Sequence, residues 1–93
     1  MLPVNWNAEA LKDLEQILGY IAERNPAAAD RLLAVATHAA EQLSEHPYLY
    51  RPGRVSGTRE AVIHPNYIMV YRVGPSAIDI ISVLHARQAY PPD

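Results

Sequence analysis

A group of basic and aromatic side chains in the second half of the chain has the residue types that phosphate chemistry requires. Guanidinium groups hold phosphate oxygens through paired hydrogen bonds, and a histidine titrates near neutrality, so it can exchange a proton with a bound molecule. His85 is expected just past the last strand, where a side chain is both exposed and positioned. The candidate target-binding surface consists of Arg51, Arg54, Arg59, Arg72, His85, Arg87 and Tyr90.

An ordinary structural role for the same residues stays open at this point. Arg59 and Arg72 can be cross-strand partners of Glu60 and Asp79, and His85 can be a polar strand end.

Motifs of cofactor and metal enzymes are absent from the sequence. It contains no G-x-G-x-x-G, Walker A loop, H-E-x-x-H or G-x-S-x-G. The four histidines share no metal-ligand spacing, and the lack of cysteine excludes disulfides, thiolate nucleophiles and cysteine-bound zinc. We therefore expect no cofactor and no metal site.

The 93 residues are predicted to form one domain, 1–93, because a second core would need roughly 50 more residues. The net charge is only −2, but it is unevenly distributed. Residues 1–50 have three basic against seven acidic side chains, and residues 51–93 have five against three. Charge of one sign gathered on one part of a fold indicates where an oppositely charged partner binds, although an ordinary solvated surface is an equal alternative.

The start of the chain predicts a cytoplasmic protein. Residues 1–6 have neither a basic stretch nor a long apolar one, so no signal peptide is expected. No apolar run approaches the roughly 18 residues that span a bilayer, so we expect no membrane partner.

A strand and two helices are predicted in the first half. Leu2–Trp6 is rich in strand-forming residues, and Asn7 suits the N-cap of a helix over 8–24. Asn25 and Pro26 end that helix and begin a second. Apolar residues repeat at helical spacing on both helices: Leu11, Leu14, Leu18 and Ile21 on the first, and Leu32, Ala36, Ala39 and Leu43 on the second. We expect Leu14, Ile21, Leu32 and Leu43 to be buried.

A loop and three strands are predicted in the second half. The loop covers 44–53, and the strands lie near Val55–Ile63, Tyr67–Val73 and Ala77–Leu84. The turns His64-Pro65-Asn66 and Gly74-Pro75-Ser76 are short, which predicts an antiparallel meander. The order β-α-α-β-β-β predicts an α+β fold with a helical hairpin on one face of an antiparallel sheet.

Ordered segments along nearly the whole chain resemble the RelE/ParE toxin superfamily. They are Val4-x-Trp6, Asp13-Leu14, Tyr20-Ile21-Ala22, Asn25-Pro26-x-Ala28-Ala29, Gly57-Thr58-Arg59-Glu60, His64 to Val73, and Val83-Leu84-His85-Ala86-Arg87. The resemblance implies the toxin of a type II toxin–antitoxin module, which causes growth arrest when free of its antitoxin and serves plasmid maintenance or a stress response. The implied partner is a cognate antitoxin whose tail wraps the toxin.

Two targets are known in this superfamily: ParE-like members poison DNA gyrase, and RelE-like members cut mRNA on the ribosome without a metal. The mRNA-cutting members of the superfamily use an arginine at the position that is Ile68 in this chain. They use two lysines at the positions that are Arg59 and Ala61 here. The segments around Arg59 and His85 are closer to ParE. The resemblance therefore favours a gyrase inhibitor with no catalytic residues. If the chain is instead a ribonuclease, its catalytic set is expected to be Arg59, His85, Arg87 and Tyr90.

Overall fold

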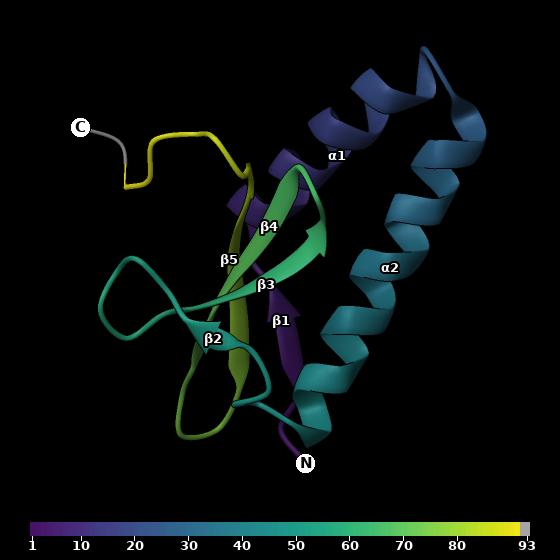
Figure 1. Cartoon of the computed structure of the whole chain (residues 1–93). Helices are drawn as coiled ribbons and strands as arrows, with labels where there is room; N and C mark the ends of the chain where they lie inside the picture. Colours follow the sequence, from purple (N-terminus) through teal and green to yellow (C-terminus); the bar gives the residue numbers. More distant parts are fainter. Residues whose placement is uncertain (92–93) are drawn as a thin grey trace.

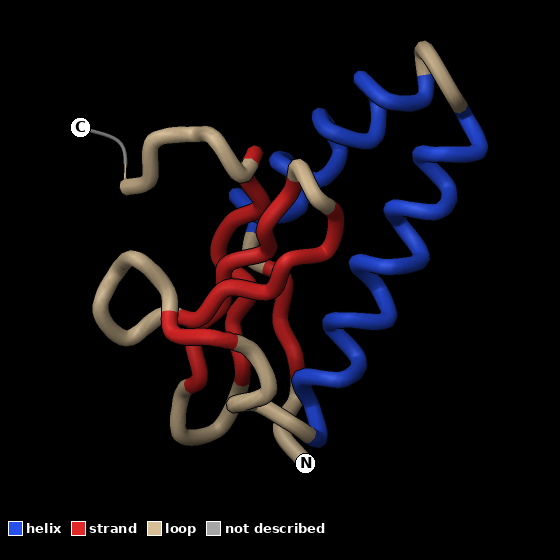
Figure 2. Tube along the Cα trace, in the orientation of Figure 1, coloured by secondary structure: helices blue, strands red, loops and turns tan. Residues whose placement is uncertain are grey.

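Two helices pack as a hairpin against one face of a five-stranded sheet in the computed structural model, which describes residues 1–91 (Figure 1). The elements in chain order are β1 (Val4–Trp6), α1 (Ala8–Ala22), α2 (Pro26–Glu45), β2 (Arg51–Pro52), β3 (Arg59–His64), β4 (Tyr67–Val73) and β5 (Ile78–His85). In Figure 2 the helices lie to one side of the sheet, and the loop before β3 and the C-terminal segment lie to the other. The predicted α+β class and helical hairpin are confirmed.

The strand order is β1-β5-β4-β3-β2. The pairs β3–β4 and β4–β5 are antiparallel, as the two short turns predicted. β1 lies parallel to β5 and pairs with Ile78–Ile80 only. One register shift separates Val70 from Tyr71 in the β4–β5 pair, so β5 has a bulge near its middle.

Asparagine side chains begin both helices, as predicted. The Asn7 Oδ1 atom accepts a hydrogen bond from the Ala10 backbone N–H at 3.0 Å, and the Asn25 Oδ1 atom accepts one from Ala28 at 3.1 Å. Each bond satisfies one of the donors that a helix start leaves unpaired. Pro26 occupies the first turn of α2, where its missing N–H costs nothing.

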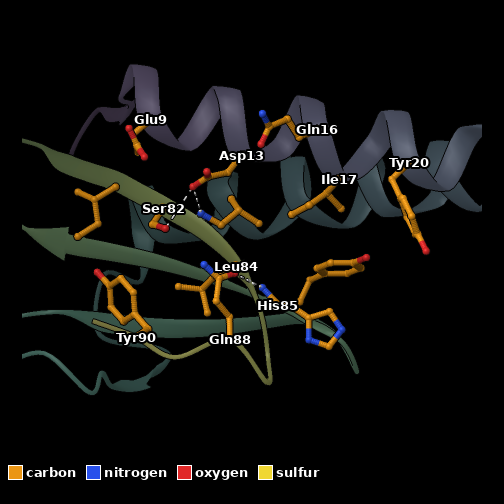
Figure 3. Close-up of a pocket in the computed structure, with 13 residues that line it drawn as sticks. Glu9, Asp13, Gln16, Ile17, Tyr20, Ser82, Leu84, His85, Gln88 and Tyr90 are labelled. Atoms are coloured by element: carbon orange, nitrogen blue, oxygen red, sulfur yellow. Dashed lines mark hydrogen bonds between the residues drawn. The ribbon is translucent and has the colours of Figure 1, made fainter. Parts of the chain in front are cut away.

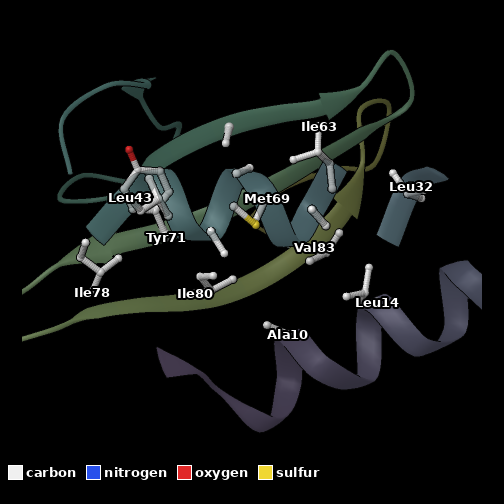
Figure 4. Close-up of a cluster of buried hydrophobic side chains, with 14 residues drawn as sticks. Ala10, Leu14, Leu32, Leu43, Ile63, Met69, Tyr71, Ile78, Ile80 and Val83 are labelled. Atoms are coloured by element: carbon white, nitrogen blue, oxygen red, sulfur yellow. The ribbon is translucent and has the colours of Figure 1, made fainter. Parts of the chain in front are cut away.

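The core lies between the helices and the sheet (Figure 4). Leu14, Leu32 and Leu43 are buried in it, as predicted, whereas Ile21 is half-buried and packs against its edge. Leu11 was expected on the same stripe but is 47% exposed, because it sits at the margin of the helix face that meets the sheet. No helix among residues 1–91 is long and apolar enough to cross a membrane.

Several predicted boundaries differ from the structure. The first strand begins at Val4 rather than Leu2, and α1 ends at Ala22 rather than Arg24. The predicted loop 44–53 contains a two-residue strand, β2, which is too short to have a periodic pattern. β3 begins at Arg59 rather than near Val55, because residues 53–58 form a compact loop closed by the Gly53 N–H bond to the Thr58 carbonyl at 2.8 Å.

Tyr71 is a buried core residue whose phenol should make the fold sensitive to alkali. Its hydroxyl donates to the Pro47 carbonyl at 2.9 Å, and burial raises the pKa of Tyr71 above its ordinary value of 10.0. The unfolded chain therefore ionises first, so stability is complete below about pH 10 and falls as pH rises toward the folded-state pKa. Tyr71→Phe should cost about 1 kcal/mol at neutral pH and flatten this fall. Urea unfolding of both proteins between pH 7 and 11 tests this prediction. It would be contradicted if the stability of the wild type fell no more steeply with pH than that of the variant.

Candidate functional site

Glu60 is a buried carboxylate at the centre of the arginine cluster. It is 3% exposed, and it lies on the face of the sheet turned away from the helices, here called the open face. Its Oε1 atom is 3.4 Å from Arg51 Nη2, and its Oε2 atom is 3.6 Å from Arg54 Nε. The Arg54 backbone N–H also donates to Oε2 at 2.9 Å. The expected Arg59–Glu60 pairing is wrong, because successive residues of a strand point to opposite faces.

Arg54 also ties the C-terminal segment to the open face. Its Nη1 atom donates to the Gln88 carbonyl at 3.3 Å, and its Nη2 atom donates to the Ala86 carbonyl at 3.5 Å. Below this segment the open face is apolar: Ile68, Val70 and Leu84 are buried against Ile81, Ala86 and Tyr90. Two of the predicted site residues, Arg51 and Arg54, are thus brought together, and their charges are partly neutralised by Glu60.

Arg59 lies on the helix side of β3 and is held by the loop before β2. Its Nη1 atom donates to the Tyr50 carbonyl at 2.6 Å, and its guanidinium carbon is 4.9 Å from the centre of the Tyr48 ring. Ala61, next on the same face, is fully buried in the core. Ile68 is paired with Val62 and therefore lies on the open face. Arg59, Ala61 and Ile68, the positions at which the RNA-cutting toxins have basic residues, therefore do not share one surface of this protein.

Arg72 is exposed and lies directly across from Asp79 in the β4–β5 pair, as the cross-strand interpretation predicted. No ion pair within 4.0 Å joins these two side chains in the described part of the chain.

His85 belongs to an aromatic cluster at the end of β5. Its ring packs edge-on against Tyr67 at 5.5 Å between ring centres, and His64 lies 5.4 Å from the same tyrosine. The Nδ1 atom of His85 accepts the Arg87 backbone N–H at 3.1 Å, and that of His64 accepts the Asn66 N–H at 3.0 Å. Within residues 1–91 the Nε2 atoms of the two rings make no hydrogen bond.

The four residues expected to form a ribonuclease set are not gathered in one place. Arg59 pairs with Tyr71 and His85 pairs with Tyr67, which are four residues apart on β4. At the rise of an extended strand, this offsets Arg59 from His85 by about 13 Å along the strand direction, and the two residues also lie on opposite sides of β4. His85 packs against Tyr67 at the end of β5, exposed Arg87 follows two residues later, and half-buried Tyr90 packs against the apolar cluster of Ile68, Val70 and Leu84.

A groove of about 510 Å³ runs between α1 and the second half of β5 (Figure 3). His85 and Tyr90 line it, together with residues that the sequence analysis did not propose as part of the target-binding surface. From α1 these are Glu9, Asp13, Gln16, Ile17 and Tyr20. They are brought to the sheet only by the packing of α1, so no local pattern could have indicated them.

A second groove, of about 740 Å³, lies among β1, α1 and α2. Its lining is mainly apolar and includes Trp6, Leu11 and Leu33, of which Leu11 and Leu33 are 47% and 45% exposed. The helices therefore leave a strip of apolar surface uncovered beside β1.

Comparison with known proteins identifies the class to which this fold and these surfaces belong. Residues 4–90 match the family described as the ParE toxin of type II toxin–antitoxin system, parDE. The chain is 38% identical to toxin Y4kP of Sinorhizobium fredii over 95% of this chain and 92% of that protein. It is 35% identical to toxin RelE2 of Caulobacter vibrioides, over 95% and 99% of the two chains.

Solved structures share the fold. A chain of the chromosomal ParDE system from P. aeruginosa superposes with a TM-score of 0.80 at 20% identity, covering 91% of this chain and 96% of that one. A chain of the RelBE2 toxin–antitoxin complex from Mycobacterium tuberculosis gives 0.62 at 23% identity, with 90% and 96% covered. The protein is a type II toxin of the RelE/ParE superfamily. Within that superfamily it belongs to the ParE toxin family, which confirms the resemblance noted in the sequence.

Proposed function

We propose that this toxin arrests growth by binding and inhibiting DNA gyrase, and that it does not cut mRNA. The observation that supports this is the composition of the open face of the sheet. Ile68, Val70 and Leu84 form its centre, and Glu60 engages the two nearby arginines. Cleavage of RNA requires charge stabilisation at the scissile phosphate, and loss of such a group typically lowers the rate by about 10²–10³-fold.

A pair of assays with the purified toxin tests this proposal. With gyrase and supercoiled plasmid, we expect cleaved DNA covalently linked to protein on a denaturing gel. With ribosomes translating a defined mRNA, we expect intact message. Message cut in the ribosomal A site, with gyrase unaffected, would contradict the proposal and would point to His85 and Tyr90, which line one groove, as an acid–base pair.

Arg87 is a cationic side chain of the candidate surface that can contact the target directly. It is exposed, and its side chain makes no hydrogen bond or ion pair within residues 1–91. Arg87→Ala should therefore leave the melting temperature unchanged and weaken target binding by about tenfold, or roughly 1.4 kcal/mol. Growth arrest after induction of each variant is the readout. Arg31→Ala, at an exposed position of α2, is the matched control, and equal toxicity of both variants would place the functional surface elsewhere.

We propose, further, that a cognate antitoxin neutralises the toxin by wrapping it. The ParDE and RelBE2 structures that share this fold come from toxin–antitoxin systems. On this chain the groove lined by Trp6, Leu11 and Leu33 offers an apolar surface for an amphipathic helix. An acidic stretch of the same tail would face Arg87 in the positively charged half. Ordering a disordered tail costs free energy, and the contacts of a long interface must offset that cost. The buried area is therefore expected to exceed about 1,600 Å².

A further inference from the structure

The loop between α2 and β2 exposes two large apolar side chains next to each other. Tyr48 is 66% exposed and Leu49 is 56% exposed. Neither lines the groove against β5 or the apolar groove of β1, α1 and α2. In Figure 1 the loop lies near the C-terminal end of α2 and the N-terminus of the chain. Single exposed apolar side chains are common on protein surfaces, whereas adjacent ones indicate a binding surface.

The backbone of this loop, residues 46–50, is held by groups that lie outside it. The hydroxyl of the core residue Tyr71 donates to the Pro47 carbonyl at 2.9 Å. The Arg59 Nη1 atom donates to the Tyr50 carbonyl at 2.6 Å. The two exposed side chains stand between these two anchored residues, at the apex of the loop. Because the apex is already ordered, a partner that binds it would lose little free energy to ordering the loop.

A guanidinium lies against the exposed tyrosine. The Arg59 guanidinium carbon is 4.9 Å from the centre of the Tyr48 ring. Arg59 makes no ion pair with a carboxylate in the described part of the chain, where Glu60 engages Arg51 and Arg54 instead. The apex therefore presents apolar surface beside a positive charge that no ion pair of those residues neutralises.

The shape and charge of the apex favour a folded protein as its partner. A disordered tail binds in a groove or along a sheet edge, whereas a rigid projecting apex fits a pocket of a folded surface. A nucleic acid is disfavoured, because Glu45 at the end of α2 is exposed next to the loop and would repel phosphates. Tyrosine and arginine are among the residue types that most often dominate the free energy of protein–protein binding.

We propose that Tyr48 and Leu49 anchor the toxin in an apolar pocket of its protein target, with Arg59 facing a carboxylate at the rim of that pocket. This inference rests on the proposed function, and it names a surface by which the toxin contacts gyrase. The loop adjoins the start of β3, which pairs with the end of β4, whereas Arg87 follows the end of β5, which pairs with the start of β4. The loop is therefore a contact additional to Arg87.

A double variant of the full-length toxin removes the apex. Tyr48→Ala with Leu49→Ser should leave the melting temperature within about two degrees of the parent, because both side chains are mostly exposed. We expect its affinity for purified gyrase to fall by about 100-fold, and growth arrest after induction to be lost. Its affinity for the purified protein encoded beside the toxin gene should stay within about twofold of the parent value, because the apex lies outside the apolar groove.

The matched control is Tyr20→Ala with Val35→Ser. Tyr20 is 57% exposed and also stacks with an arginine, since the Arg24 guanidinium carbon lies 3.9 Å from its ring centre. Val35 is 46% exposed on α2. This variant removes the same kinds of side chain from the helices, so its affinity for gyrase should stay within about twofold of the parent value.

The charge at the rim has a separate test. Arg59→Gln should make association with gyrase less sensitive to salt than association of the parent, whereas Arg59→Lys should keep the salt dependence. Equal salt dependence in the parent and in Arg59→Gln would contradict the carboxylate at the rim.

The outcomes separate this inference from the function on which it rests. If the parent and the double variant inhibit gyrase equally, the gyrase proposal stands and the loop inference is overturned. If the parent leaves gyrase unaffected but the double variant alone loses growth arrest, gyrase is the wrong target and the loop still anchors the toxin on its target. Two results would assign the loop to another partner and overturn the inference: loss of binding to the protein encoded beside the toxin gene, or loss of binding to a single-stranded oligonucleotide that the parent binds.

Discussion

Leu14→Asp is expected to abolish folding at room temperature. Leu14 is 7% exposed and packs in the main core beneath the sheet (Figure 4). The aspartate would lose the apolar contacts of the leucine and would bury a carboxylate with no cationic partner there. The combined cost, about 4 kcal/mol or more, approaches the whole stability of a domain of this size. Circular dichroism and a thermal melt of the purified variant measure it.

The matched control is Leu11→Asp, three residues earlier on the same helix. Leu11 is 47% exposed, so its replacement should change stability by no more than about 1 kcal/mol. Because Leu11 lines the apolar groove of β1, α1 and α2, the same change is expected to weaken antitoxin binding. Equal melting temperatures for the Leu14 variant and the parent would rule out the packing described here.

Hydrophobic periodicity predicted most of the fold because each helix and each longer strand has a face that must be buried. Leu14, Leu32 and Leu43 were identified as core residues in this way. Periodicity did not predict the exposure of Leu11. It shows which side of a helix is apolar, but it does not show how much of that side the sheet covers. It also missed β2, whose two residues are defined by the partner strand and not by their own sequence.

The candidate site was less predictable because its contacts join distant residues. The arginines were found from residue type, but Glu60 was assigned to the wrong partner. Its real partners, Arg51 and Arg54, reach it from nine and six residues earlier through a folded loop. Asp13 contacts Ser82 and Val83 from 69 and 70 residues away, and nothing in either segment indicates that contact.

Arg54→Ala is expected to destabilise the toxin far more than Arg51→Ala. Both side chains contact Glu60, but the Arg51 side chain is 58% exposed and that of Arg54 is 35% exposed. A solvent-exposed ion pair contributes about 0–1 kcal/mol, which sets the expected cost at Arg51. Loss of Arg54 leaves a buried carboxylate with fewer partners and releases the Ala86 and Gln88 carbonyls. We therefore expect the free energy of unfolding to fall by about 2–3 kcal/mol.

A double-mutant cycle with Glu60→Gln separates the ion pair from the rest of this effect. In the Arg54→Ala background the carboxylate is already under-paired, so neutralising it should cost less than in the parent, and it can restore part of the lost stability. Urea unfolding of the parent, the two single variants and the double variant gives the coupling energy between Arg54 and Glu60. The Arg54→Ala protein should also bind a fluorescent apolar dye, because release of the C-terminal segment uncovers Ile68, Val70 and Leu84 on the open face. Equal unfolding midpoints for the Arg51 and Arg54 variants, with no added dye binding, would mean that this segment is held on the sheet by Tyr90 and its apolar contacts without help from the arginine.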